Sequence, residues 1–208
     1  MLNEKAFTLS EVLITLGIIG TVAAITMPSL INNYQKQSTA AKVKKFYNTI
    51  NNAVNLSAAE NGDVNTWFPE KKDNTYEENA KFVRTYILPY LKYTKAEKCS
   101  ETSILFCVYL IDGGLMTWRT DKNGTDIVYY VNGKSEKNTH NYFPFQFNKA
   151  TNISPKTFVE PYTFRWNGEY ETLKTNEDLG CRKDCTNPAY CTKMLQLNNW
   201  QFPKNYPW

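Results

Sequence analysis

The apolar residues of this chain are concentrated in one run near its N-terminus. From Phe7 to Met27 the sequence reads FTLSEVLITLGIIGTVAAITM, and Glu11 is the one ionisable side chain within it. A helix of about 20 apolar residues is long enough to cross the hydrocarbon core of a bilayer. The run therefore predicts a membrane-spanning helix that carries a carboxylate near its start.

Beyond Pro28 the apolar pattern changes from continuous to periodic. The apolar side chains recur at steps of three and four residues, which is the spacing of an amphipathic helix. They are Leu30, Ile31, Tyr34, Val43, Phe46, Tyr47, Ile50, Val54 and Ala58. Asn61-Gly62 is a common helix stop. We therefore expect one helix from near Phe7 to about Glu60, with the apolar face of its second half packed on a sheet.

The rest of the chain, residues 62–208, has the pattern of one α+β unit. Helical spacing, interrupted by Pro89, predicts a short helix over Asn79–Tyr93. Short runs rich in β-branched and aromatic residues predict strands. These runs are Ser103–Leu110, Leu115–Thr120, Asp126–Val131, Phe143–Phe147, Thr157–Phe158 and Tyr162–Trp166. Asn123-Gly124 between two of them is a strong hairpin signal.

Three kinds of protein segment share such an N-terminal apolar run. A secretory signal peptide needs a basic stretch before the run and a small-residue cleavage site after it. Here Glu4 and Lys5 cancel, and no Ala-x-Ala pattern follows Met27. An ordinary membrane anchor leaves Glu11 unexplained, because a carboxylate in a membrane helix is costly and needs a neutralising partner. The third kind accounts for this residue.

The residues Lys5-Ala6-Phe7-Thr8-Leu9-Ser10-Glu11 resemble the cleavage and methylation signature of type IV pilins and type II secretion pseudopilins. In that family a prepilin peptidase cuts before the Phe and methylates the new amino group. The resemblance implies a leader peptide over residues 1–6, cleavage between Ala6 and Phe7, and N-methylation of Phe7. The family usually has Gly before the cut, so Ala6 is a small departure.

The resemblance also gives Glu11 a role in filament assembly. In an apolar filament core, the terminal ammonium of one subunit would pair with Glu11 of a neighbour. Removing one partner of a buried ion pair costs about 3–5 kcal/mol, so such a pair would fix the position of each subunit relative to its neighbour. The alternative is that Glu11 merely reaches the membrane interface.

Two further positions fit the same family. Pro28 stands where pilins often place a helix-bending proline, and Gly20 stands where some pilin helices loosen in the filament. A proline inside a helix removes a hydrogen bond and kinks the axis. The alternative is that Gly and Pro are simply common in membrane helices.

The implied architecture is a pilin-like α+β fold, in which a long helix packs on an antiparallel sheet. Residues 7–28 would be the transmembrane and filament-core segment, residues 29–61 its amphipathic continuation, and residues 62–208 a periplasmic or extracellular head. The protein would cross the inner membrane once before entering a filament. Its implied partners are the prepilin peptidase and methyltransferase, other pilin-like subunits, the inner-membrane platform protein, and the bilayer before assembly.

Charge adds one complication to this picture. The net charge of +4 is matched by four lysines in residues 29–59, and the head itself is nearly neutral. These lysines are Lys36, Lys42, Lys44 and Lys45. A basic cluster beside a membrane helix favours the cytoplasmic side, which argues against an external head. The motif is the stronger argument, because a dedicated insertion pathway overrides a small charge bias.

All five cysteines lie in the head, which suits an oxidising compartment. The spacing of Cys99 and Cys107 suits a disulfide that closes a small loop. We expect Cys191 to pair with either Cys181 or Cys185, so one thiol is left over. A zinc site with four thiolates is the alternative, but a C-x3-C-x5-C spacing is a poor match to one.

Metal-binding chemistry is otherwise sparse in the head. Asp121, Asn123 and Asp126 offer oxygen ligands for calcium, but no bidentate Glu completes a full calcium loop. We therefore expect a plain turn here, with no cofactor and no metal.

Catalytic chemistry is equally sparse. His140 is the only histidine, and it lies in a polar loop without a neighbouring carboxylate. The sequence has neither a nucleophile elbow nor a phosphate-binding loop motif. Glu160, Glu169 and Glu171 lie among Tyr162, Trp166 and Tyr170, a composition that sugar-cleaving sites share. Core and hairpin packing is the more ordinary explanation for such aromatic residues.

These observations predict a structural subunit of a type IV pilus-like or type II secretion pseudopilus filament, which contributes to protein secretion. The chain would be a substrate of the peptidase and no enzyme itself. The alternative is a minor pilin that binds DNA during uptake or provides a surface for adhesion. The nearly neutral head gives nucleic-acid binding little support.

Overall fold

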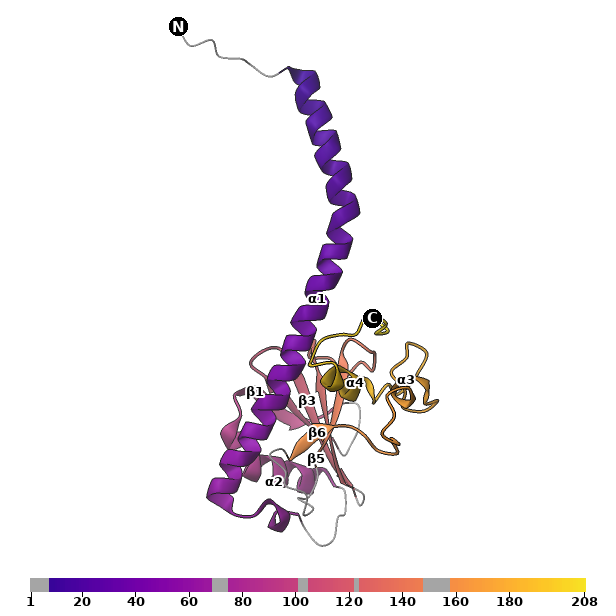
Figure 1. Cartoon of the computed structure of the whole chain (residues 1–208). Coiled ribbons are helices and arrows are strands. Elements are labelled where there is room, and N and C mark those ends of the chain that lie inside the picture. Colours follow the sequence, from indigo (N-terminus) through magenta and orange to yellow (C-terminus); the bar gives the residue numbers. More distant parts are fainter. Residues whose placement is uncertain (1–7, 69–74, 101–104, 122–123, 148–157) are drawn as a thin grey trace. The chain divides into compact units, whose positions relative to one another are not determined.

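The computed structural model describes residues 8–68, 75–100, 105–121, 124–147 and 158–208 of the 208-residue chain (Figure 1). The chain divides into two compact units, residues 1–38 and residues 39–208. Helix α1 (Leu9–Asn61) is continuous over 53 residues and contributes to both units. The expected α+β, pilin-like fold, with a long N-terminal helix and an antiparallel sheet, is confirmed.

The second unit is built on a six-stranded sheet in which every neighbouring pair of strands is antiparallel. Its strands lie side by side in the order in which they occur in the sequence. They are β1 (Tyr93–Lys98), β2 (Phe106–Leu110), β3 (Leu115–Asp121), β4 (Gly124–Tyr130), β5 (Tyr142–Phe147) and β6 (Val159–Pro161). Each strand is thus joined to the next by a local connection.

The core of this unit lies between the second half of α1 and one face of the sheet. Val43, Ile50 and Val54 of α1 are fully buried, and the Phe46 ring stacks on Tyr129 with ring centroids 4.4 Å apart. Successive strand residues point to opposite faces, so every second residue of β3, β4 and β5 enters this core. The fully buried ones include Met116, Trp118, Ile127, Tyr129, Phe143 and Phe145.

Asn51 attaches the edge strand β6 to α1. Its side-chain amide donates to the Val159 carbonyl at 2.9 Å, and its Oδ1 accepts from the backbone N–H groups of Phe158 and Val159 at 3.0 and 2.9 Å. A buried backbone group needs a hydrogen-bond partner, and β6 is only three residues long. Here a helix side chain supplies partners that a further strand would otherwise provide.

Five short helices complete the described part of the chain. They are η1 (Val64–Thr66), α2 (Tyr76–Tyr86), η2 (Leu88–Tyr90), α3 (Thr172–Thr175) and α4 (Cys191–Leu197). Thr75 caps α2 by accepting the Glu78 N–H at 3.2 Å. Helix α4 packs against β5 and β6, so the C-terminal part of the chain is tied to the end of the sheet.

Several predicted elements are present in the structure. Strands β3, β4 and β5 lie at three of the predicted runs, and β2 covers the second half of a fourth, whose residues 103–104 lie outside the described residues. Helix α1 ends at Asn61, as expected. Gly62 follows with φ +77°, where a residue without Cβ is favoured, and its N–H donates to Ala58 at 3.0 Å.

Other predicted elements are wrong. The helix expected to reach Tyr93 ends at Tyr86, because Pro89 cannot continue it, and the unpredicted strand β1 begins at Tyr93. The strand expected over Tyr162–Trp166 is a turn in which Arg165 has φ 61°. Of the strand expected at Thr157–Phe158, Thr157 lies outside the described residues and Phe158 is a bend just before β6.

Candidate functional site

The first turn of α1 is closed by reciprocal hydrogen bonds between Thr8 and Glu11. The backbone N–H and the hydroxyl of Thr8 each donate to Glu11 Oε2 at 2.8 Å, and the Glu11 N–H donates to the Thr8 hydroxyl at 3.3 Å. This arrangement is a capping box, which satisfies N–H groups that a helix start leaves without partners. Glu11 therefore has a local partner, which the sequence analysis missed although the Thr-x-x-Glu spacing is visible there.

The rest of the N-terminal unit presents apolar side chains to its surroundings on all sides of the helix. Leu9 is 80% exposed and Ile25 is 79% exposed. The other large exposed apolar residues in this stretch are Val12, Leu13, Ile14, Leu16, Ile18, Ile19, Val22, Met27, Leu30, Ile31 and Tyr34. Soluble monomers rarely expose so large an apolar surface. By length and composition α1 can cross a membrane, a test that signal sequences also pass.

Three threonines inside this apolar stretch bind their own helix. The hydroxyls of Thr15, Thr21 and Thr26 donate to the carbonyls of Val12, Ile18 and Val22, each at 2.9 Å. A hydroxyl that enters an apolar medium without a partner is costly. These three are already satisfied, so Glu11 remains the charged group that must be accommodated there.

The other predicted site residues of this segment are not tested by the structure. Gly20 and Pro28 both lie inside α1, and their bending role remains a prediction. No contact within 4 Å crowds the position of a Cβ on Gly20, so nothing in the chain itself requires glycine there. Ala6 and Phe7, the expected cleavage and methylation site, lie outside the described residues.

The cysteines of the head form two disulfides. Cys99 joins Cys107, and Cys181 joins Cys191 with their Cα atoms 4.7 Å apart. Cys185 is a buried free thiol that donates to the Asp178 carbonyl at 3.3 Å. Of the two pairings that the sequence left open for Cys191, the structure has the one with Cys181. Because these four cysteines are joined in disulfides, they cannot supply thiolate ligands to a zinc ion.

The residues considered for calcium are not arranged around an ion. Asp126 forms an ion pair with Arg119, with Oδ2 and Nη2 2.7 Å apart. Asn123 and the side chain of Asp121 lie outside the described part of the structure. Within the residues that are described, no group of three or more His, Cys, Asp or Glu side chains is placed to hold a metal.

The three glutamates considered for sugar chemistry have separate structural partners. Glu160 accepts hydrogen bonds from the Tyr47 hydroxyl and the Gln196 amide, both at 3.0 Å, and so connects α1, β6 and α4. Glu171 forms an ion pair with Lys174 at 3.0 Å. Glu169 bonds through its backbone: its carbonyl accepts from the Trp166 indole N–H at 2.8 Å, and its N–H donates to Asn167 Oδ1 at 3.0 Å. The three glutamates therefore make structural contacts and do not converge on a common site.

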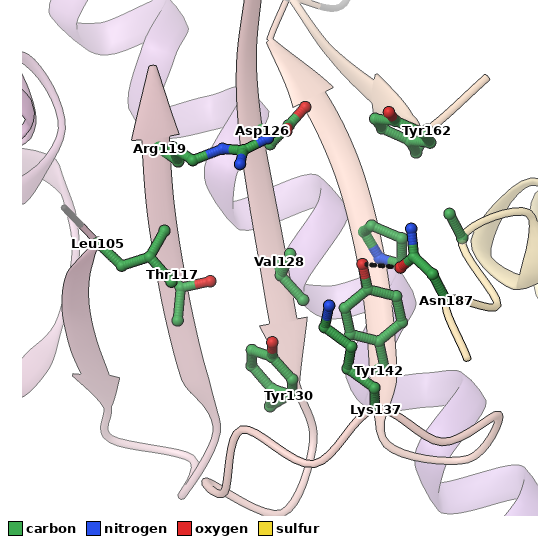
Figure 2. A pocket seen from close by; sticks show the side chains of 12 residues that line it. Leu105, Thr117, Arg119, Asp126, Val128, Tyr130, Lys137, Tyr142, Tyr162 and Asn187 are labelled. Carbon is green, nitrogen blue, oxygen red and sulfur yellow. Dashed lines mark hydrogen bonds and ion pairs between the residues drawn. The ribbon is translucent and has the colours of Figure 1, made fainter. Parts of the chain in front are cut away.

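A cavity of about 250 Å³ lies on the face of the sheet that points away from α1 (Figure 2). The Arg119–Asp126 ion pair lies on one side of it, and the Tyr142 hydroxyl donates to Asn187 Oδ1 at 2.7 Å on the other. Burial raises the pKa of Tyr142 above its ordinary value. Tyr130 and Tyr142 are both almost fully buried, so they form the floor of the cavity and leave little ring surface for a ligand.

Residues 29–208 match a family described as a family of unknown function, DUF6613. The chain belongs to this family. Residues 1–27 of the DUF6613 chain match the prokaryotic N-terminal methylation motif. No curated protein and no solved structure matches the chain.

The motif confirms that this DUF6613 protein is type IV pilin-like, as the residues Lys5–Glu11 indicated. A chain with this motif is processed by prepilin peptidase and assembles with other pilins, and the motif points to a structural subunit and not to an enzyme. Together with the long apolar helix, it suits a pilin anchored in the inner membrane. The capping box, the apolar helix surface and the motif thus belong to one N-terminal site.

Proposed function

We propose that this protein is a subunit of a pseudopilus-type filament that serves protein secretion. One observation carries the proposal: the methylation motif coincides with the exposed apolar stretch of α1, and between Leu9 and Met27 the one ionisable side chain of that stretch is Glu11. An apolar helix of this kind is covered by lipid before assembly and by neighbouring helices afterwards. The head would lie outside the filament core.

Processing would place a new amino group next to the capping box. Cleavage between Ala6 and Phe7 leaves Phe7 as the first residue, directly before Thr8. Methylation keeps the positive charge of that amine. The charge would then stand at the start of α1, where the unpaired N–H groups of the helix also carry partial positive charge.

Glu11 has a carboxylate oxygen available for a neighbour's ammonium. Both of its bonds to Thr8 use Oε2, and no described residue donates to Oε1. The ammonium of the next subunit can therefore bind Oε1 while the capping box remains closed. In an apolar core the uncompensated carboxylate is costly, so only a register that supplies this ammonium is favourable.

The proposed topology is a single crossing of the inner membrane with the head in the periplasm or outside. Two disulfides in the head support it, because such bonds persist in oxidising compartments. The lysines at 36, 42, 44 and 45 favour the opposite orientation by their charge. Insertion through the pilin pathway, with the platform protein as partner, is proposed to overcome that bias.

A minor pilin for DNA uptake or adhesion remains the alternative within the same class. It would share the motif, the peptidase and the apolar helix, and would differ in what the head binds. The cavity in Figure 2 has a mostly buried floor and an ion-paired rim, so it does not favour this alternative.

The intact mass of the protein purified from a host with an active prepilin peptidase tests the proposed processing. We expect loss of residues 1–6 and addition of one methyl group to Phe7. The matched control is the same protein from a host without the peptidase, which should retain its leader. An unprocessed chain in both hosts, or a cut at another bond, would contradict the proposal.

A further inference from the structure

A second cavity of the head, of about 290 Å³, lies where the C-terminal residues meet two loops. One loop contributes residues 137–140 and the other contributes residues 182–188. The C-terminal residues are fastened to the first loop: the Thr139 hydroxyl donates to the Pro207 carbonyl, and the Tyr206 hydroxyl donates to the Thr139 carbonyl. These two hydrogen bonds fix the C-terminal residues against the first loop and so define one wall of the cavity.

The charged side chains that line this cavity are all basic. They are Lys137, Arg182 and Lys183, and the only histidine, His140, lies beside them. Among the residues that the structure describes, no carboxylate forms an ion pair with Lys137 or Lys183. Figure 2 shows that Lys137 reaches over Tyr142, with its Nζ 5.8 Å from the ring centroid.

Arg182 has hydrogen-bonding capacity that the protein does not use. Its Nη2 donates to the Glu177 carbonyl at 3.4 Å. Its Nε is buried and forms an ion pair with the exposed Asp184 Oδ1 at 3.4 Å, but it makes no hydrogen bond. A buried guanidinium N–H without a hydrogen bond is unfavourable, so an acceptor in the cavity would stabilise this arrangement.

The cavity also has an aromatic side. The His140 ring lies 5.5 Å from the Trp208 ring, measured between centroids, and both residues line the cavity. Burial and the nearby Lys183 lower the pKa of His140, while Glu136 opposes them.

We propose that this cavity binds the phosphate group of a phosphorylated compound whose ring packs beside Trp208. Guanidinium and ammonium groups are the side chains that bind phosphate oxygens in proteins. The volume is large enough for a phosphate group with one ring of the size of a sugar. This site is separate from the N-terminal assembly site, so the proposal does not depend on the filament function.

Binding of an anion here is linked to the protonation of His140. An anion beside the imidazole favours its charged form, and by reciprocity the protonated form binds the anion more tightly. The other charged groups in or beside the two loops are Glu136, Lys137, Arg182, Lys183 and Asp184. We assign the change in affinity between pH 5 and 8 to His140, because imidazole is the side chain whose charge ordinarily changes in that range.

The test uses sulfate as the probe, because it remains doubly charged throughout this pH range. The full chain is held in neutral detergent micelles at constant ionic strength, and the single histidine is labelled with ¹³C at Cε1 and followed by NMR. We expect a saturable shift of the His140 signal with sulfate. The dissociation constant should be several-fold lower at pH 5.5 than at pH 8, and a rise in the pKa of His140 of about one unit on binding sets a limit of about tenfold.

Variants of single lysines test whether the cavity is the binding site. Lys183→Gln should weaken sulfate binding about tenfold. Lys204→Gln, which removes the same charge from an exposed position outside the cavity, should leave it unchanged. Both substitutions are on the surface, and circular dichroism checks that both variants fold. Equal weakening by both variants, or a shift that chloride reproduces at the same ionic strength, would overturn the proposal.

Competition experiments then distinguish the sources of the phosphate. Displacement of sulfate by glucose 6-phosphate supports a soluble or polysaccharide-borne phosphate, and displacement by phosphatidylinositol added to the micelles, whose headgroup carries a ring on its phosphate, supports a lipid headgroup. Displacement by a single-stranded oligonucleotide alone, with a steep dependence on salt, would indicate an extended polyanion surface and would overturn the proposed site.

Discussion

Glu11 has two carboxylate oxygens in different surroundings. Oε2 closes the first turn of α1 through Thr8, whereas Oε1 has no donor among the described residues. A capping residue and an intermolecular ion-pair partner are usually considered as alternatives for such a carboxylate. Here one side chain is able to do both, because each role uses a different oxygen.

The first prediction concerns this residue. Glu11→Ala should leave membrane insertion intact, because it makes the apolar run more apolar, and should strongly reduce incorporation into filaments, because the neighbouring ammonium loses its partner. Crosslinking of membranes followed by immunoblotting measures incorporation, and carbonate extraction measures insertion.

Two comparisons sharpen this test. Glu169→Ala removes an exposed head carboxylate and should assemble as the unmodified chain does. Thr8→Ala opens the capping box but keeps the carboxylate, so it should assemble better than Glu11→Ala. Normal assembly of Glu11→Ala would show that the ion pair does not drive register.

At the scale of elements, the contact between α1 and β6 depends on one side chain. Asn51→Ala removes the partners of three backbone groups next to an edge strand. Each unsatisfied buried group costs about 1–3 kcal/mol, and water reaches part of this edge, so we expect a loss of about 2–4 kcal/mol. Urea unfolding of the full chain in micelles, followed by tryptophan fluorescence, measures it.

Asn52→Ala is the matched control, because Asn52 is the exposed neighbour on the same helix. It should change the free energy of unfolding by less than about 0.5 kcal/mol. Equal effects of the two substitutions would mean that the hydrogen bonds of Asn51 are not what holds β6.

The elements that the sequence predicted are those whose own residues determine them. Strands β3, β4 and β5 alternate buried aromatic and aliphatic residues with residues that face the other side, and this alternation is visible in the sequence. Strand β1 was missed because YTKAEK is a polar, largely exposed edge. Strand β6 was misplaced because its three residues depend on Asn51, which lies far away in the sequence.

The candidate sites were predictable to different degrees for the same reason. The methylation motif and Glu11 are adjacent in the sequence and need no fold to be recognised. The basic cavity joins residues near 137–140, 182–188 and 208, which only the folded head brings together. The clustered glutamates and aromatic residues near 160–171 resembled a sugar site but pack with unrelated partners.

At the scale of the whole molecule, two disulfides stabilise the head at different places. The bond between Cys181 and Cys191 spans 10 residues and holds α4 in the C-terminal cluster with Leu173, Tyr190 and Met194. Closing a loop of this size lowers the conformational entropy of the unfolded chain and so raises its free energy by about 2–3 kcal/mol. Replacing both cysteines by alanine should lower the free energy of unfolding by about that amount, as measured by urea unfolding without reductant.

Cys185→Ser is the control for this third prediction, because it removes a cysteine but neither disulfide. It should destabilise the head less than the double replacement does. Titration of thiols in denaturant without reductant should find one per unmodified chain. Five thiols per chain would contradict both the pairing and the oxidising compartment.

The distance in sequence between Asn51 and β6 has a consequence for biosynthesis. A ribosome delivers α1 first, and the backbone groups that bind Asn51 follow 108 residues later. Until they emerge, the Asn51 side chain can bond only within its own helix, where its amide donates to the Tyr47 carbonyl at 3.0 Å. A product terminated before Phe158 never acquires the bonds to β6. The hydrogen bonds of Asn51 thus distinguish a completed head from a truncated one, which gives cellular quality control a physical difference to act on before any subunit joins a filament.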